Sequence, residues 1–168
     1  EAAKKVGIDS FLNHAPHELS GGQKQRVSLA GVMVDNVEIF LFDEPLANLD
    51  PASGKKTIEL IDQIYKDTGA TIIIVEHRIE DVLHRSVDRV VLMGEGSIIL
   101  DTTPDKLLSS DSLIKNGIRE PLYVTALKYA GVEIKEEMKP GMIDTLILSD
   151  GDKKKVIDWI ESVPDKPQ

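Results

Sequence analysis

The sequence contains no cysteine, so it has no disulfide framework and no thiolate metal site. This absence fits a reducing compartment, and we expect a protein of the cytoplasm. The sequence also lacks any apolar run near the roughly 20 residues that a membrane-spanning helix requires. We therefore expect any membrane association to be peripheral.

An excess of basic residues is missing as well. The 20 Lys and Arg residues are outnumbered by 29 Asp and Glu residues, which gives a formal net charge of -9. A nucleic-acid-binding face needs clustered Lys and Arg, so we expect no nucleic-acid partner. The run Lys153 to Lys155 is most simply the exposed face of a helix, with binding to an acidic membrane or to nucleic acid as the alternative.

What is present is ordinary globular composition, with 41% hydrophobic and 29% charged residues. The 168 residues allow one domain, or one domain with an appendage. The sequence begins at Glu1 rather than Met, inside a helical pattern, and we expect it to be a fragment of a longer protein.

The first stretch with chemical meaning is Leu19-Ser20-Gly21-Gly22-Gln23-Lys24-Gln25-Arg26. Its serine is a natural N-cap, and the two glycines that follow leave backbone N–H groups accessible at the start of a helix. The positive end of a helix dipole favours a phosphate at such a place. This stretch predicts half of a phosphate site.

The second stretch is Ile39-Phe40-Leu41-Phe42-Asp43-Glu44-Pro45. Its nearly continuous apolar run is typical of a parallel strand buried on both faces. Adjacent carboxylates at the carboxyl end of such a strand are suited to hold Mg²⁺ and to polarise a water molecule. The two stretches together predict ATP hydrolysis.

Alternating helices and strands predict an α/β fold with a parallel sheet core, and strand, helix and strand over 37–75 predict a right-handed crossover. A domain over 1–109 is followed by a C-terminal appendage over 110–168 with its own small α/β pattern. We expect helices over 1–12 (broken near Gly7), 20–34, 51–68, 79–85, 103–109, 111–116, 121–130 and 152–162, and strands over 37–42, 70–75, 88–93, 97–100 and 143–148. Asp35-Asn36 is expected to end the second of these helices.

Residues 13 to about 108 resemble the C-terminal half of an ABC-type ATPase cassette, which has the P-loop NTPase fold. Leu19–Arg26 resembles the family signature, and Ile39–Pro45 the Walker B strand with its catalytic glutamate. Leu46–Asp50 resembles the D-loop, and Glu76-His77 after an apolar strand resembles the switch histidine. Four motifs in the family's order make the resemblance specific.

The resemblance implies ATP and Mg²⁺ as cofactors and assigns roles at the carboxylate strand. Asp43 would hold Mg²⁺ through water, and Glu44 would orient or deprotonate the attacking water. His77 would contact the γ-phosphate and sense its loss. The residues alone leave a plainer alternative, in which Asp43 caps a turn, Glu44 lies in solvent and His77 is a packing residue.

The resemblance further implies that the signature binds the γ-phosphate of ATP held by an opposite cassette, and that the D-loop communicates across the cassette pair. The residues concerned are Ser20, Gly21, Gly22, Gln23, Asn48 and Asp50. A capped helix start with two glycines is otherwise an ordinary turn, and Asp50 can also be the N-cap of its helix.

Several parts of a complete cassette are missing. No GxxxxGK[ST] phosphate loop occurs, and Ser53-Gly54-Lys55-Lys56-Thr57 is a decoy because Leu49 stands where the first glycine should be. The glutamine loop and the aromatic residue that would stack on adenine are missing too. We therefore expect this chain alone to bind nucleotide very weakly and to hydrolyse none. His14, His17 and His84 have no partners at metal-ligand spacing.

Two segments resemble the first ATPase half of double-cassette energy-coupling-factor importers of the cobalt or vitamin type: Val75–Asp81 and Arg119–Leu127. That resemblance implies a second cassette, arranged head to tail and on the same parent polypeptide. It also implies a transmembrane coupling protein and a substrate-binding membrane component as partners, and a place on the cytoplasmic face of the cell membrane. The alternatives are a non-transport ABC ATPase acting on nucleic acid or the ribosome, and a non-catalytic regulatory fragment.

Overall fold

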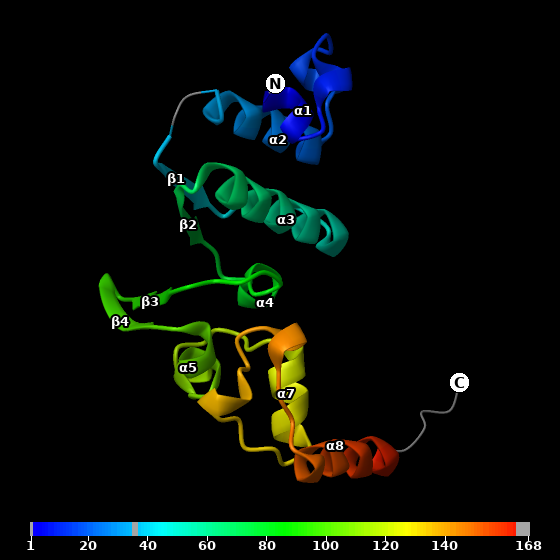
Figure 1. The fold of residues 1–168 in the computed structure, drawn as a ribbon, viewed down its shortest axis with the longest axis vertical. Helices are drawn as coiled ribbons and strands as arrows, with labels where there is room; N and C mark the ends of the chain where they lie inside the picture. Colours follow the sequence, from blue (N-terminus) through cyan, green and yellow to red (C-terminus); the bar gives the residue numbers. More distant parts are fainter. Residues whose placement is uncertain (1, 35–36, 164–168) are drawn as a thin grey trace. The chain divides into compact units, whose positions relative to one another are not determined.

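The computed structural model describes residues 2–34 and 37–163, which form two compact units, 1–77 and 78–168 (Figure 1). We call them the first and the second unit and describe each by itself. The expected helix end at Asp35-Asn36 lies outside the described residues. Within the described ranges, no helix is both long and apolar enough to cross a membrane.

The first unit alternates helices with two strands. Its elements are α1 (Ala2–Lys5), η1 (Asp9–Phe11), η2 (Pro16–Glu18), α2 (Gly21–Val32), β1 (Ile39–Asp43), α3 (Pro51–Thr68) and β2 (Thr71–Val75), where η marks a 3-10 helix. The expected break near Gly7 is confirmed, since this glycine has φ +66° between α1 and η1. Gly69 has φ +67° and ends α3 in the left-handed conformation.

The two strands of this unit pair in parallel, from Ile39 opposite Thr71 to Asp43 opposite Val75. The connection between them is helix α3, as the sequence predicts. One side of the unit is a core in which Phe40, 4% exposed, packs with Ile64 of α3. The parallel α/β core is thereby confirmed over residues 37–75.

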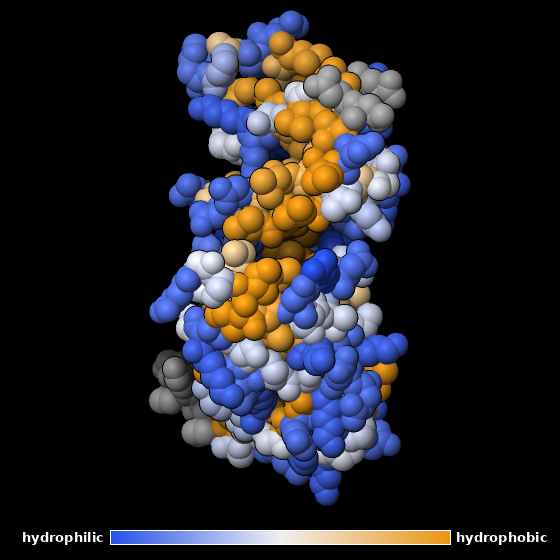
Figure 2. Space-filling view, turned by 90° about the vertical axis from the view of Figure 1, so that its left-hand side faces the viewer, coloured by the Kyte–Doolittle hydropathy of each residue, from blue (hydrophilic) through white to orange (hydrophobic). Residues whose placement is uncertain are grey.

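The expectation that the strand over 37–42 is buried on both faces is wrong for this chain. Leu41 is 68% exposed and Ile39 59%, while on the neighbouring strand Val75 is 51% exposed. Figure 2 shows apolar side chains gathered on the face of the molecule that carries the strands. The reason is that the core built by α3 and its neighbours covers one face of β1 and β2 and leaves apolar residues of the other face in solvent.

The second unit contains a hairpin followed by short helices. Its elements are α4 (Ile79–Val82), β3 (Val90–Gly94), β4 (Ser97–Thr102), α5 (Pro104–Leu108), α6 (Ser112–Lys115), α7 (Leu122–Tyr129), η3 (Glu136–Met138), η4 (Ile143–Thr145) and α8 (Asp150–Ser162). Strands β3 and β4 are antiparallel with a register shift at Leu92/Met93, which confirms the expected hairpin.

Residues 110–163, which we call the tail, share one hydrophobic core with residues 78–109. Leu107 of α5 and Val124 of α7 are fully buried in this core, and Leu113 of α6 is 1% exposed. Leu83 and Leu92 belong to the same cluster. The tail therefore packs as part of the second unit. The predicted division into a domain over 1–109 and an appendage over 110–168 stays a prediction.

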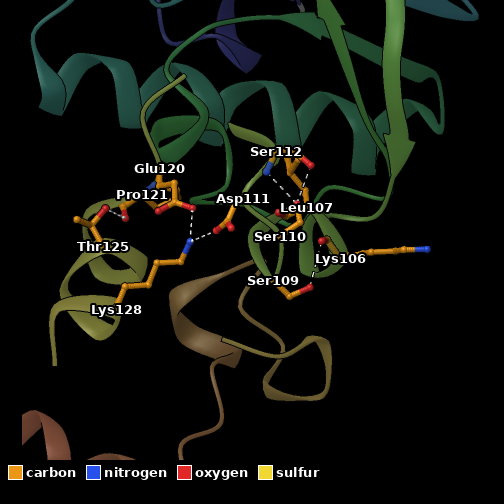
Figure 3. Close-up of polar contacts among 10 residues, drawn as sticks. All are labelled: Lys106, Leu107, Ser109, Ser110, Asp111, Ser112, Glu120, Pro121, Thr125 and Lys128. Carbon is orange, nitrogen blue, oxygen red and sulfur yellow. Dashed lines mark hydrogen bonds and ion pairs between the residues drawn. The ribbon is translucent and has the colours of Figure 1, made fainter. Parts of the chain in front are cut away.

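A polar cluster joins the start of the tail to α7 (Figure 3). The Glu120 side chain is only 3% exposed, and its Oε1 lies 2.7 Å from Lys128 Nζ. Asp111 Oδ1 lies 3.3 Å from the same nitrogen. Burial lowers the pKa of Lys128, but the hydrogen bonds to Glu120 and Asp111 outweigh it and hold that pKa above its ordinary value. The buried carboxylate is thus paired, as burial of a charge requires.

The strand expected over 143–148 is wrong. Residues Ile143–Thr145 form the 3-10 helix η4, and Leu146 to Leu148 run without a sheet partner. Leu146 and Leu148 instead pack against the core of the second unit. These two leucines complete a core built largely from helices, so the described part of the tail is helical rather than α/β.

Substitution of a buried tail residue is expected to destabilise the whole second unit. We expect Leu113→Ala to lower the free energy of unfolding by about 2–5 kcal/mol, because the truncated side chain leaves a cavity in the shared core. Urea unfolding followed by circular dichroism measures this. Ile114→Ala is the matched control, since Ile114 is the next residue and is 58% exposed. Equal effects of the two substitutions would contradict the shared core.

Candidate functional site

The carboxyl ends of β1 and β2 bring two of the predicted motifs together. Asp43 is the last residue of β1 and pairs with Val75, the last residue of β2. The Glu44 N–H donates to the Val75 carbonyl at 2.9 Å. Asp43-Glu44 and Glu76-His77 therefore leave the same edge of one parallel pair, which is where open α/β sheets bind ligands.

The backbone at this edge is strained at two predicted site residues. Glu44 has φ +46° and Asn48 has φ +60°, although neither is glycine. The left-handed region costs energy for residues with a side chain, and such residues gather at functional sites. The loop after β1 holds two such residues within five positions, an observation independent of the motif match, while Glu95 and Lys139 have the same conformation elsewhere in the chain.

Asp43 and Glu44, the two carboxylate residues at the end of β1, are both exposed to solvent. Among the residues that the structure describes, no group of three or more His, Cys, Asp and Glu residues could hold a metal ion. Mg²⁺ is commonly bound by one or two carboxylates together with waters and substrate phosphates. That Asp43 holds such an ion stays a prediction.

Glu76 ties the two motifs together. Its side chain is 3% exposed. Oε1 accepts a hydrogen bond from Leu46 N–H at 3.1 Å, and Oε2 accepts one from His77 N–H at 3.0 Å. The His77 side chain is 71% exposed, with Nδ1 3.7 Å from Glu76 Oε2. One buried carboxylate thus connects the segment after β1 to the histidine after β2.

Sequence reasoning used Glu76 only as part of a motif and missed this bridging contact. The signal in the sequence was the position of Glu76 directly after an apolar strand, because a carboxylate buried there needs hydrogen-bond donors from elsewhere in the chain. Its partner Leu46 lies 30 residues away in the chain, and nothing local identifies it.

The signature residues build a capping box at the start of α2. Ser20 Oγ accepts from Gln23 N–H at 3.3 Å, and Gln23 Oε1 accepts from Ser20 N–H at 2.7 Å. The expected N-cap at Ser20 is confirmed. Among the residues that the structure describes, none would lie within 4 Å of a Cβ atom added at Gly21 or Gly22, so packing in this part of the chain does not explain the two glycines.

Helix α2 is also joined to the carboxylate strand. Gln25 Nε2 donates to the carbonyl oxygen of Pro45, 20 residues further along the chain. Sequence reasoning quoted Gln25 in the signature without giving it a role. Within residues 2–34 and 37–163, no hydrogen bond or ion pair joins Ser20 or Gln23 to the carboxylates or to His77. The structure thus links the two motifs through Gln25 and does not bring the signature onto Glu44.

Asp50 is the N-cap of α3. Its Oδ1 accepts from the N–H groups of Ala52 and Ser53 at 3.0 Å each, and Oδ2 accepts from Ser53 Oγ at 2.5 Å. These bonds, the Ser53 hydroxyl foremost, lower the pKa of Asp50. The plainer alternative from the sequence, a helix cap, is confirmed, and the role of Asp50 across a cassette pair stays a prediction. The decoy around Gly54 lies inside α3, as expected.

Acid is expected to loosen the start of α3. Because the folded-state pKa of Asp50 is lowered, its contribution to stability is complete above the ordinary aspartate pKa of about 3.9 and is lost as pH falls through the folded value. We expect wild type to show this loss and Asp50→Asn, which keeps the cap without a titrating group, to lack it. Amide exchange of Ala52 and Ser53 between pH 2 and 5 measures the difference; identical profiles would contradict it.

Comparison with known proteins shows two family profiles on this chain. The profile described as "ABC transporter" matches residues 1–47. The profile described as "ATP-binding cassette cobalt transporter" matches residues 110–168. The first match holds the signature and the carboxylate strand, and the second holds the tail.

Several curated relatives are similar over most of this chain. A protein of Vibrio parahaemolyticus named as an ABC transporter ATP-binding protein is 62% identical over 146 residues, which are 87% of this chain and 25% of the relative. A protein of Clostridium perfringens with the same description is 57% identical over 161 residues, 96% of this chain and 28% of the relative. The chain thus spans about a quarter of the length of the curated relatives it matches.

Solved structures that are similar to this chain also carry ABC transporter descriptions. CbiO1 of Clostridium perfringens, described as part of the ABC transporter complex cbiONQ, is 37% identical with a TM-score of 0.61, over 68% of this chain and 45% of that protein. An ATP-binding cassette of an ABC transporter in its ADP conformation is 24% identical with a TM-score of 0.63, over 71% of this chain and 48% of that one, and it shows the fold alone. The chain belongs to the ATP-binding cassette family of ABC transporters and carries part of one P-loop NTPase-type ATP-binding domain.

Proposed function

We propose that this chain is part of the ATPase component of an ABC transporter that couples ATP hydrolysis to import of a small solute. The observation that carries the proposal is the joint position of Asp43, Glu44 and His77 at the carboxyl ends of one parallel strand pair. Carboxylates and a histidine gathered at such an edge suit phosphoryl transfer, which depends on positioning and electrostatics.

Each residue at the edge has a distinct part in this proposal. Glu44 orients the attacking water and accepts its proton, which its exposed carboxylate permits. Asp43 holds Mg²⁺, and that ion would neutralise charge on the phosphate oxygens. His77 contacts the γ-phosphate with an imidazole that is 71% exposed, while buried Glu76 holds the backbone N–H of the same residue.

In this proposal the signature binds a second ATP molecule, not the one beside Asp43 and Glu44. The N–H groups at Gly21 and Gly22 and the Ser20 hydroxyl bind the γ-phosphate of ATP held by a second cassette, arranged head to tail with this one. The room that the described residues leave over both glycines supports this role. Asn48, with φ +60°, belongs to the loop that would face the same partner. A phosphate loop with its lysine must come from outside these 168 residues.

A similar protein and a family profile support the transport part of the proposal. CbiO1 is described as part of a transporter complex, and the profile on the tail is described as a cobalt transporter. We propose that the solute is a vitamin, a vitamin precursor or a metal ion. A transmembrane coupling protein would receive the motion, and a separate membrane component would bind the solute. The ATPase would then lie on the cytoplasmic face of the cell membrane.

The chain by itself is expected to lack the activity. It has no phosphate-binding loop of the GxxxxGK[ST] type, so MgATP should show no micromolar binding in isothermal titration and no phosphate release. Micromolar affinity for MgATP would show that these residues form a complete nucleotide site, and this part of the proposal would be wrong.

In the full-length protein, Glu44→Gln is expected to lower the rate of ATP hydrolysis by about 10²- to 10⁴-fold while ATP still binds, because the general base is lost. Phosphate release and filter binding of labelled ATP measure the two quantities. Glu95→Gln is the matched control, since Glu95 is also an exposed glutamate with positive φ (+47°) but lies in the hairpin turn. Loss of hydrolysis in both variants, or in neither, would overturn the role of Glu44.

A further inference from the structure

Gln25 lies on the signature helix α2, within the first unit and shortly after the N-cap residue Ser20. The capping box between Ser20 and Gln23 fixes the first turn of this helix. Further along α2, Leu29 is buried in the core cluster that also contains Phe40 of β1. Gln25 therefore leaves the helix between the turn that carries the signature and the turn that packs on the strand core.

Pro45, the residue after Glu44, needs a hydrogen-bond donor for its backbone. It is buried, and a proline has no N–H, so the carbonyl oxygen is its one backbone hydrogen-bonding group. The Gln25 side-chain nitrogen Nε2 donates to that oxygen across 20 positions of sequence. A buried carbonyl left without a donor costs free energy, so this bond connects α2 firmly to the segment that leaves β1.

Glu44 itself is held in a backbone conformation that its side chain disfavours. Its φ is +46°, and a residue other than glycine keeps such a backbone where the surrounding structure imposes it. The Glu44 N–H donates to the Val75 carbonyl at 2.9 Å, and the Glu44 carbonyl accepts from Ala47 N–H at 3.0 Å. Two residues further on, Glu76 accepts from Leu46 N–H at 3.1 Å.

Gln25 adds a contact from a different part of the chain. The bonds of Glu44 and Leu46 join the two strands and the segments that directly follow them, whereas Gln25 belongs to α2. The carbonyl that Gln25 binds is that of Pro45, the next residue after the strained glutamate. A displacement of α2 would therefore move the backbone beside Glu44.

We propose that Gln25 is a positioning residue for the ATPase reaction: its hydrogen bond to the Pro45 carbonyl fixes Glu44 relative to the signature helix. Gln25 itself contacts no reactant in this role. A γ-phosphate bound at the signature would then act on Glu44 through this one side chain. The inference rests on the proposed function, because it requires Glu44 to be the general base.

The first test is hydrogen exchange in the full-length protein without nucleotide. We expect Gln25→Ala to speed exchange of the Leu46 and Ala47 amides about fivefold, because the loop after β1 loses one of its hydrogen bonds. Exchange of the Met33 amide, which donates to the Leu29 carbonyl at 3.0 Å, should not change. Faster exchange at Met33 as well, or unchanged exchange at both loop amides, would overturn the specific connection between α2 and the loop.

Gln63→Ala is the matched control for this substitution. The Gln63 side-chain nitrogen also donates a hydrogen bond, at 2.7 Å to Asp67 Oδ1, but both residues lie on α3 and the bond is exposed. Gln63→Ala should leave exchange at the loop amides and the rate of hydrolysis unchanged. Gln25→Lys is the rescue variant, because lysine keeps an N–H donor on a long side chain.

The second test measures steady-state hydrolysis in the full-length protein. We expect Gln25→Ala to lower kcat about three- to tenfold with KM for MgATP unchanged, because Glu44 is misplaced while the nucleotide contacts remain. Gln25→Lys should restore most of kcat. In a Glu44→Gln background, Gln25→Ala should cause little further loss, because the residue on which Gln25 acts is already replaced.

The outcomes separate the two claims. If Glu44→Gln leaves hydrolysis unchanged, the proposed function is wrong. If Glu44→Gln slows hydrolysis but Gln25→Ala does not, the positioning role is wrong and the proposed function stands. If Gln25→Ala slows the Glu44→Gln protein by the same factor as the wild type, Gln25 acts on something other than Glu44, and the positioning role is again wrong.

Discussion

The parallel pairing of β1 and β2 is the constraint on which the candidate site depends. Its register places Asp43 opposite Val75, so the carboxylate motif and the histidine motif leave the sheet at one edge. A slip of one residue would turn every side chain of a strand to the other face and would separate the two motifs. Glu76 adds a second tie at that edge, since its buried carboxylate binds the N–H groups of Leu46 and His77.

The same strands carry the candidate site although apolar residues on one face of their sheet are exposed. One face of β1 and β2 packs on α3, and the other presents Leu41 and Val75 to solvent. The apolar composition of these strands suits burial on two faces, as in other parallel sheets. The second unit is covered differently, because side chains of the tail complete the core around Leu107 and Leu92.

Local features of this fold could be predicted from the sequence, because their causes lie within a few residues. The Ser20 and Asp50 caps and the Gly69 helix end are of this kind. The tertiary contacts could not be predicted, since Gln25 to Pro45 and Glu80 to Leu122 join residues 20 and 42 positions apart. The prediction of a strand over 143–148 was wrong because a short apolar run, here Leu146 to Leu148, also suits irregular backbone packed on a helical core.

The central claim is that Asp43, Glu44 and His77 face one γ-phosphate. The most direct measurement is the structure of the full-length protein, in its Glu44→Gln form, trapped with ATP and Mg²⁺. We expect the metal beside the Asp43 carboxylate and the His77 imidazole in contact with the γ-phosphate. A nucleotide bound with its γ-phosphate away from both residues would contradict it.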